Sequence, residues 1–313
     1  MNPPAGGDSP PRVKRRWQRV DGVLLLDKPI GYSSNQALQA ARRLFQAEKA
    51  GHTGTLDPLA TGLLPLCFGE ATKFAGELLG ADKRYVARLL LGVTTTTGDA
   101  EGELMEQRPV DVSDESVDSV LMEFQGPIQQ VPPMYSALKR DGRPLYAYAR
   151  AGEVVERDAR SVIIHSLVRL PCALPYVEFE VHCSKGTYVR TLATDIGERL
   201  GCGAHLTALR RTGIGNLGLQ GAFTLDELAG KDEALRAGVL APADALLADL
   251  KAITLDVEQS GRMRQGQVVK TDCVVSGRVR IYGNQGAFIG LGKCSGDGLL
   301  RPERLVAESS KSN

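Results

Sequence analysis

Aromatic residues are scarce in this chain, and an apolar run long enough to cross a membrane is missing. Of 313 residues, 5% are aromatic and a single one is tryptophan. No apolar stretch approaches the roughly 20 residues that a bilayer-spanning helix requires. The first residues, MNPPAGGDSPPRVKRRW, are polar, proline-rich and basic, unlike a secretory signal. We therefore expect neither membrane insertion nor secretion, and we expect a cytoplasmic protein.

Paired cysteines are also missing. Six cysteines are scattered along the chain, and their spacing matches neither a disulfide framework nor a zinc motif. GCGAH (201–205) and the pair His182-Cys183 bring cysteine close to histidine, but a zinc site needs four ligands at matched spacing. A turn at a helix end and buried thiols explain these residues. We expect reduced thiols and no bound metal.

The chain also lacks a βαβ unit that could give a glycine-rich motif the role of binding a dinucleotide. GIGNLG (213–218) matches G-x-G-x-x-G, but it follows RRT and no helix opens after it. The fingerprint has meaning only between a strand and a helix of a βαβ unit. We expect no nucleotide cofactor.

Net charge is nearly absent, at +1, yet the charges are unevenly distributed. Residues 1–50 hold nine Lys or Arg against four Asp or Glu, and residues 259–313 repeat that ratio. Residues 99–123 hold one Arg against nine acids. Basic segments gathered on one face bind polyanions. Charge alone favours an ordinary solvated surface over a polyanion-binding face.

Alternating patterns of helix and strand fill the chain from residue 22 to about 250. Periodicity and turn residues predict the boundaries. Strands are expected at 22–29, 83–92, 161–170 and 176–184, and helices at 33–47, 70–80, 113–126 and 187–201. Residues 204–215 form a strand or an irregular segment. Residues 129–152 form a strand, a turn and a helix, with an exposed basic loop (KRDGR) at 139–143.

The composition changes near residues 230–250, where short Ala/Leu helices are joined by Gly and Pro. Beyond this point short apolar runs alternate with glycine turns, and NQG (284–286) indicates a hairpin. We predict a second, all-β unit of about 60 residues, which is within the size of an independent domain.

One acid stands alone in GHTGTLDPLATG (51–62). Asp57 is followed by proline, the arrangement typical of a helix start, so N-capping is one interpretation. Gly51 and Gly54 let the backbone turn tightly just before it. Arg190 offers a guanidinium that could hold an isolated carboxylate ionised. Asp57 is therefore either a helix cap or a reactive group in a cleft.

Two tyrosines stand beside basic or glycine-rich residues. Tyr85 lies in DKRY and Tyr188 in SKGTY. A phenol can stack on a nucleobase while neighbouring cations contact phosphates. For either tyrosine taken singly, a position on a half-buried strand or at a helix end is the better explanation. Patterning alone assigns Leu209 to the core, and Lys28-Pro29 to a turn that ends a strand.

Taken together, several stretches resemble the TruB family of bacterial tRNA pseudouridine synthases. They occur in the family's order and are followed by a small C-terminal β unit, so the resemblance covers about residues 20 to 310. The stretches are LLLDKPIGYSSN (24–35), AGHTGTLDPLATGLLPLCFGEATKF (50–74), DKRYVARLLLG (82–92), PPMYSALK (132–139) and HCSKGTYVRTLATDIGERLGCGAHLTALRRT (182–212).

The resemblance implies a fold and a division into domains. The fold is mixed α/β (α+β), a pseudouridine synthase domain on a central antiparallel sheet with a small PUA-type β domain at the C-terminus. The implied catalytic domain covers 21–250 and the PUA-like RNA-binding domain covers 251–310. Residues 1–20 form a basic tail, expected to be disordered, that matches nothing in the family.

The resemblance also implies an activity, the isomerisation of uridine 55 to pseudouridine in the T-loop of tRNA. Asp57 falls on the catalytic aspartate, either as covalent nucleophile or as the base that starts glycal formation. Arg190 falls on the arginine that pairs with it. One carboxylate suffices for this chemistry, and the family uses no cofactor and no metal.

The remaining implied roles concern RNA. The target uridine must leave its loop, and His52 then fills space near the vacated stack. Tyr85 stacks on the flipped base, and Tyr188 and Leu209 complete its pocket. Lys28 supports the active-site region. The 139–143 loop lies in a segment that closes over the RNA arm. The implied partner is the T-arm of tRNA, with no required protein partner and a monomeric enzyme.

Two other functions stay open from the residues. An RNA-binding folding factor would open and re-anneal tRNA without depending on Asp57. A guide-RNA-dependent synthase of the H/ACA type would need partner proteins, and the small C-terminal unit argues against it.

Overall fold

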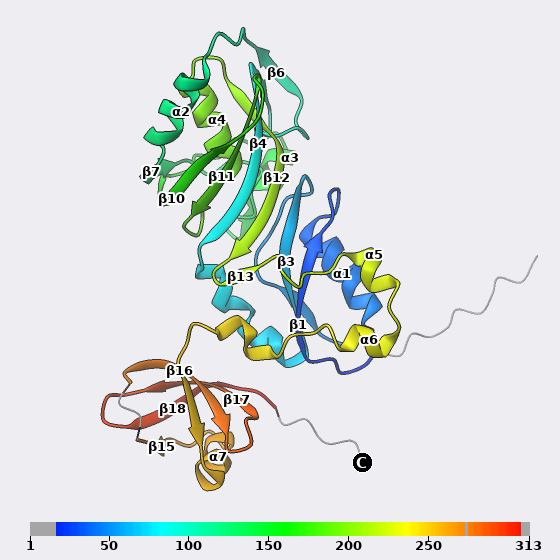
Figure 1. The fold of residues 1–313 in the computed structure, drawn as a ribbon, viewed down its shortest axis with the longest axis vertical. Helices are drawn as coiled ribbons and strands as arrows, with labels where there is room; N and C mark the ends of the chain where they lie inside the picture. Colours follow the sequence, from blue (N-terminus) through cyan, green and yellow to red (C-terminus); the bar gives the residue numbers. More distant parts are fainter. Residues whose placement is uncertain (1–16, 273–274, 308–313) are drawn as a thin grey trace, which may run out of the picture.

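The computed structural model describes residues 17–272 and 275–307, in which one large sheet and one small sheet organise the chain (Figure 1). The large sheet has nine strands, with the order β1-β3-β12-β4-β11-β10-β7 and with β2 and β13 attached to β3 and β12. Its strands are β1 (Gly22–Lys28), β2 (Ala50–His52), β3 (Ala60–Phe68), β4 (Lys83–Leu91), β7 (Gly126–Gln130), β10 (Arg160–Leu170), β11 (Tyr176–Cys183), β12 (Ala204–Ile214) and β13 (Leu217–Gly218).

The pairings in this sheet are antiparallel apart from the one between β12 and β3, which is parallel. At this seam Leu209 lies opposite Ala60 and Arg211 opposite Gly62. Gly62 has a φ of +98°, and a Cβ there would lie 2.3 Å from the carbonyl oxygen of Arg211. Glycine is therefore required for the two strands to approach. The predicted antiparallel sheet is confirmed, with this one parallel joint that the sequence did not reveal.

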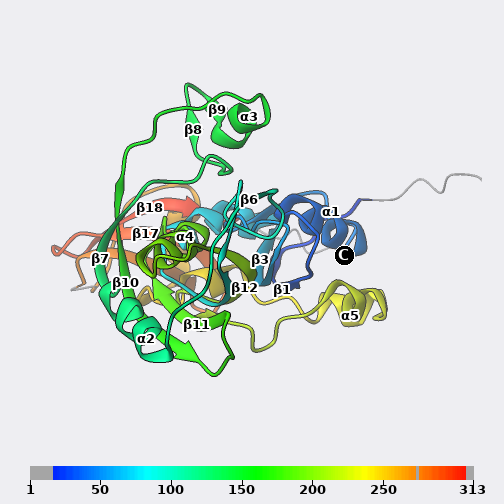
Figure 2. The same ribbon diagram turned by 90° about the horizontal axis from the view of Figure 1, so that it is seen from above.

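Helices cover the sheet and complete one continuous core that includes Leu26, Leu89, Phe179 and Leu192. Figure 2 shows α2 and α4 on the half of the sheet that carries β10 and β11. Their amphipathic faces bury apolar side chains, which supplies most of the stability of such a domain. The helices are α1 (Ser34–Leu44), α2 (Asp114–Glu123), α3 (Leu145–Arg150), α4 (Val189–Arg199), α5 (Leu225–Ala229) and α6 (Glu233–Ala237), with 3₁₀ helices η1 (Gly69–Gly80) and η2 (Ala243–Leu247).

The helix predictions are confirmed at 33–47, 113–126 and 187–201, although each helix is shorter than predicted. Ser33 caps α1 in a capping box with Gln36, which is the signal that located it. The helix predicted at 70–80 is a 3₁₀ helix. Glycines at both of its ends and at Gly76 lower α-helix propensity. The carbonyl of Lys73, within this helix, accepts a hydrogen bond from Arg304.

The part of the chain that connects β7 to β10 forms a hairpin and a short helix, and these stand apart from the sheet (Figure 2). The predicted basic loop forms the two-residue turn Asp141-Gly142, where both residues have positive φ, as a type I′ turn requires. The hairpin strands are β8 (Lys139–Arg140) and β9 (Arg143–Pro144), followed by α3; a second small ribbon pairs β5 (Val93–Thr95) with β6 (Leu104–Gln107).

The C-terminal unit is a five-stranded sheet with its own core. The hairpin predicted at 284–286 joins β16 to β17. The all-β expectation was incomplete, because the unit also contains α7 (Val257–Arg264). Asp256 and Gln259 cap this helix in a capping box, a signal that Gly261 obscured. Its strands are β14 (Ala252–Leu255), β15 (Val269–Lys270), β16 (Gly277–Gly283), β17 (Phe288–Cys294) and β18 (Leu299–Leu305).

The small sheet docks on η1 through an apolar contact between Phe74 and Phe288 and through polar contacts. Arg278 pairs with Glu77 at 2.7 Å, and Lys73 donates to the carbonyl of Leu305 at 2.9 Å. Of the tail expected over residues 1–20, the structure describes residues 17–20, and Gln18 bridges to Ala47. Within the described part of the chain, no helix has both the length and the apolar character needed to cross a membrane.

Candidate active site

Asp57 lies in the loop that leads from β2 into β3. Pro58 and Leu59 form a turn, the amide of Ala60 donates to the carbonyl of Asp57 at 3.1 Å, and β3 begins there. No helix starts at this point, so the capping interpretation is wrong. The hydroxyl of Ser34 bonds both the amide and the carbonyl of Leu56, at 2.7 and 3.1 Å. The loop is thereby fixed to the start of α1, with the carboxylate of Asp57 free to serve another role.

Arg190, in the first turn of α4, reaches Asp57 from the other side of the sheet seam. Its side chain is 6% exposed, and its Nη2 lies 3.0 Å from Oδ2 of Asp57. Its Nε lies 3.5 Å from a second carboxylate, that of Asp99. Its Nη1 and Nη2 also donate to the carbonyls of Thr97 and Tyr135, at 3.3 and 2.6 Å. The guanidinium is thus held on all its edges and has one fixed orientation toward Asp57.

The electrostatics around Asp57 act in two directions. Desolvation raises the pKa of Asp57, and the charge of Asp99 raises it further. The charge and hydrogen bond of Arg190 lower that pKa, as does the charge of Lys28. The pKa of Asp57 is raised overall, and the cations beside the carboxylate limit this rise and favour its ionised, nucleophilic form.

A cavity of about 590 Å³ opens beside this ion pair. Tyr85 on β4, Tyr188 at the N-cap of α4 and Leu209 on β12 line it together with Asp57 and Arg190. Five of the six predicted site residues therefore meet in one cavity, although they come from four separate segments of the chain. The cavity combines an apolar and aromatic wall with one anionic group, which suits a planar base attached to a sugar.

His52, the sixth predicted residue, ends β2 and lines a neighbouring cavity of about 420 Å³. Asp57 and Arg190 line both cavities, so they stand at the boundary between them. Burial and the charge of Arg211 lower the pKa of His52. The Nδ1 atom of His52 is buried and lacks a hydrogen-bond partner among the described residues.

Arg211 is a site residue that sequence reasoning missed. It is 1% exposed, lines the larger cavity, and donates through Nε to the carbonyl of Leu63 at 2.7 Å. Its charge interacts with the phenol of Tyr85. The signal was strand alternation: once 204–214 is known to be a strand, Leu209 and Arg211 must share a face.

Asp99 and Lys28 were also underestimated. Asp99 lies in a turn-rich stretch and gives no pattern of its own, yet its side chain is 4% exposed and accepts from Thr97 at 2.5 Å. Lys28 is fully buried and donates to the carbonyls of Pro29 and Tyr32. Burial lowers the pKa of Lys28 to about 8, and Asp57 opposes that shift.

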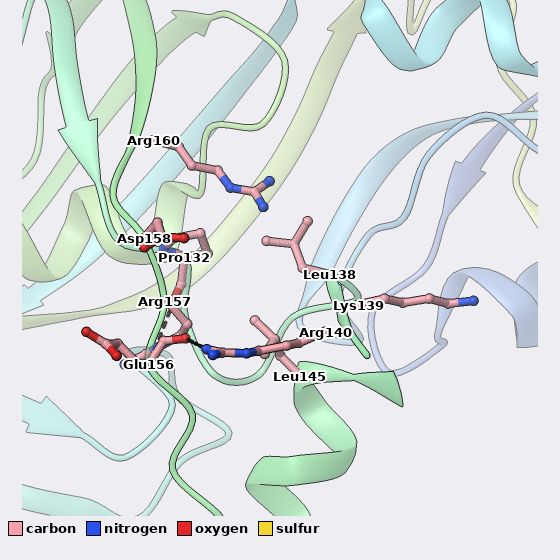
Figure 3. Close-up of a pocket in the computed structure, with 9 residues that line it drawn as sticks. All are labelled: Pro132, Leu138, Lys139, Arg140, Leu145, Glu156, Arg157, Asp158 and Arg160. Carbon is pink, nitrogen blue, oxygen red and sulfur yellow. Dashed lines mark hydrogen bonds between the residues drawn. The ribbon is translucent and has the colours of Figure 1, made fainter. Parts of the chain in front are cut away.

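A third cavity, of about 360 Å³, lies under the β8–β9 hairpin (Figure 3). Neither Asp57 nor Arg190 lines it. Arg140 reaches across it to the carbonyl of Glu156, while Lys139 and Arg160 come from opposite sides. This cavity therefore marks the base of a basic hairpin and not the reactive centre.

Family models match nearly the whole chain. A model described as "TruB family pseudouridylate synthase (N terminal domain)" matches residues 42–189. Residues 190–248 match "tRNA pseudouridylate synthase B C-terminal domain", and residues 252–306 match "Pseudouridine synthase II TruB, C-terminal". The first two models meet between Val189 and Arg190, so the ion pair of the site spans them.

Curated relatives are similar over almost their full length. A tRNA pseudouridine synthase B of Burkholderia mallei (strain ATCC 23344) is 57% identical over 303 residues, which cover 95% of this chain and 96% of the relative. The enzyme of the same name from Cupriavidus metallidurans (strain CH34) is 55% identical over 307 residues, covering 95% and 97%.

Solved structures share the fold. The archaeal box H/ACA sRNP Nop10-Cbf5 complex contains a chain with a TM-score of 0.69 and 25% identity, covering 91% of this chain and 85% of that one. A Cbf5-Nop10-Gar1 complex gives a TM-score of 0.68 and 27% identity, covering 92% and 84%. The α+β fold with its large sheet is therefore that of a pseudouridine synthase.

Proposed function

This chain belongs to the TruB family, the tRNA pseudouridine synthases that make pseudouridine 55 in the T-loop, and we propose that Asp57 performs that isomerisation here. The observation that carries the proposal is the 3.0 Å ion pair between Asp57 and Arg190. It lies at the wall of a cavity that is lined by Tyr85, Tyr188 and Leu209.

The reaction needs one well-placed carboxylate. The bond between C1′ of the ribose and N1 of uracil breaks, and a bond between C1′ and C5 forms. N1 gains a proton, C5 loses one, and the overall change is an isomerisation. Asp57 can attack C1′ and form a sugar ester, or it can remove the C2′ proton and give a glycal. Both routes use the ionised carboxylate that Arg190 favours.

The cavity gives the detached base a place to turn. A uridine inside a folded loop must swing out before Asp57 can reach its sugar. Tyr85 offers a ring on which uracil can stack, and Tyr188 and Leu209 close the other sides. His52 lies in the adjoining cavity, across the Asp57–Arg190 pair, where it can occupy the position that the base has left.

The RNA arm contacts we propose are electrostatic. The segment from β8 to α3 carries Lys139, Arg140, Arg143 and Arg150 beside the site, and such cations neutralise phosphates. We assign residues 21–250 to the catalytic domain and 251–310 to a PUA-type domain that extends the RNA-binding surface. We further propose that the chain acts on tRNA as a monomer without a protein partner.

Tritium release from tRNA labelled at C5 of uracil tests the proposal, with the modified position mapped on the product. The wild type should release tritium and form one pseudouridine, in the T-loop. Asp57→Asn should release none while binding tRNA within about threefold of the wild type, because the two side chains have the same shape. Asp114→Asn, an exposed acid on α2, is the matched control and should keep full activity.

Two results would overturn the proposal. Release by Asp57→Asn would move the chemistry to another group. A wild type that binds and refolds tRNA without any release would make this chain the RNA folding factor that the residues alone left open.

A further inference from the structure

Two of the four histidines in the chain meet on the face of the large sheet that lies opposite the cavity. His165 on β10 and His182 on β11 have ring centroids 4.7 Å apart. Asp82, which directly precedes β4, places Oδ2 at 3.1 Å from Nε2 of His165 and 4.0 Å from Nε2 of His182. One oxygen and two imidazole nitrogens therefore converge on a single point.

A local irregularity of the sheet produces this convergence. Ile164 lies opposite Cys183 and Ser166 lies opposite His182, so His165 is the extra residue of a β-bulge. A bulge changes the direction of the side chain that it carries. Here it brings His165 beside His182 on the neighbouring strand, on the exposed side of the sheet.

From this geometry we propose that Asp82, His165 and His182 form a binding site for a divalent transition-metal ion of the zinc class. Their ligand atoms all lie within 4.8 Å of one another. Zinc–nitrogen and zinc–oxygen bonds of about 2.0–2.2 Å place tetrahedral ligand atoms about 3.4 Å apart, which lies between the 3.1 and 4.0 Å that separate Asp82 from the two imidazoles. Imidazole and carboxylate ligands suit zinc, nickel and copper, whereas magnesium requires oxygen ligands. Water would take the fourth position.

The proposal differs from the zinc motif that the sequence made improbable. Strand alternation puts Cys183 on the opposite face from His182, where its thiol contacts the carbonyl of Lys83 and lines the larger cavity. The ligands come instead from three separate segments of the chain, which leaves no spacing to recognise. Arg84 acts on His182 with its positive charge and would oppose a dication, so we expect binding on the order of micromolar, below the affinity of four-ligand structural sites.

The site would tie the start of β4 to β10 and β11, and two of these strands, β4 and β11, also line the cavity. Lys83 and Cys183, the neighbours of Asp82 and His182, line that cavity from the other face. A bound ion would link the junction of η1 and β4 to β10 and β11. The whole chain should therefore melt at a higher temperature with zinc than without it.

Equilibrium titration of the full chain with ZnCl₂ and CoCl₂ tests the site. We expect one ion per chain, cobalt absorption bands of tetrahedral geometry, and no competition from a hundredfold excess of magnesium. Asp82→Asn and His165→Gln should each weaken zinc binding at least about tenfold. Both side chains are partly exposed, so the variants should fold, and their melting temperatures without metal verify this.

Matched variants separate this site from others. Glu180→Gln removes a negative charge from the same face of β11 and should change the affinity less than about threefold. Cys172→Ser removes a half-exposed thiol and should change nothing. No binding at 100 µM metal, binding that survives His165→Gln, or a thiolate charge-transfer band with cobalt would each overturn the proposal.

Discussion

Two arginines in this molecule each stand between two carboxylates, yet their surroundings differ. Arg190 contacts Asp57 and Asp99 with 6% of its side chain exposed. Arg278, on the small sheet, contacts Glu77 and Glu303 with 40% exposed. Water can replace the partners of an exposed arginine, whereas a buried one depends on every partner it has. The same arrangement of charges is therefore a buried, fixed triad beside the cavity in one place and a surface contact in the other.

Replacing each arginine by lysine should give the largest contrast. Arg190→Lys keeps the charge but loses the fork that holds Asp57, Asp99 and two carbonyls, so we expect kcat/KM to fall at least about a hundredfold, with about 3 kcal/mol lost in unfolding free energy. Arg278→Lys should change neither by more than about twofold or 1 kcal/mol. Tritium release and urea unfolding measure both. Equal effects at the two positions would show that burial does not separate them.

Changing the second carboxylate should act through pH. Because burial and Asp99 raise the pKa of Asp57, wild-type activity should be lost, as the pH falls, at a pH above the value of about 4 that is ordinary for aspartate. Asp99→Asn removes a negative charge, lowers the pKa of Asp57, and should move this acid limb to lower pH. The pH profile of kcat/KM reports the free enzyme. An acid limb that moves upward would contradict the assigned electrostatics.

A half-buried acid without an arginine extends the comparison to stability. Asp195 on α4 makes no ion pair with the described side chains, and burial raises its pKa to about 6. Its ionised form therefore destabilises the fold: the favourable contribution is complete below the unfolded value near 4 and is lost as pH rises through 6. Asp195→Asn should stabilise the protein by about 1 kcal/mol at pH 8, since the site is partly open to solvent.

The pH dependence is the check on that prediction. In urea unfolding at pH 8, the free energy of unfolding of Asp195→Asn should be higher than that of the wild type. This difference should be smaller at pH 5. A constant difference would show that the effect does not arise from ionisation.

The smallest effect should come from removing the exposed triad. Arg278→Ala breaks the contact of the small sheet with η1 and one ion pair within the small sheet, but each exposed pair contributes only about 0–1 kcal/mol. We expect a fall of at most about 1 kcal/mol that diminishes in 1 M NaCl, where the Debye length is about 3 Å. A cost that does not depend on salt would point to packing by the arginine stem.

Local signals explain which parts of this fold were predictable. The cap residues of α1 and α2 and the alternation of β11 are written in neighbouring residues, and those elements were located correctly. The parallel joint between β3 and β12 depends on residues about 150 positions apart, so no window of sequence could show it. Arg211 was missed because 204–215 could be a strand or an irregular segment, and only a strand places Arg211 on the face of Leu209.

The resemblance to the family identified the site residues, and the structure shows that five of them line one cavity. Asp57, Tyr85 and Leu209 lie in separate segments. From the local pattern alone, Asp57 could be a helix cap, Tyr85 could end a strand and Leu209 could belong to the core. The bulge at His165 could not be predicted from periodicity. A register shift of one residue there turns the side chain of His165 toward His182.

The parallel seam also has a consequence for the way the protein is made. A chain leaves the ribosome from its N-terminus, so β3 and the loop of Asp57 emerge about 140 residues before β12. Until β12 is free to pair, Leu209 and Arg211 cannot take their places and the cavity lacks this part of its wall. The nascent chain thus carries the carboxylate of Asp57 through roughly half of its synthesis before the cavity beside it can be completed.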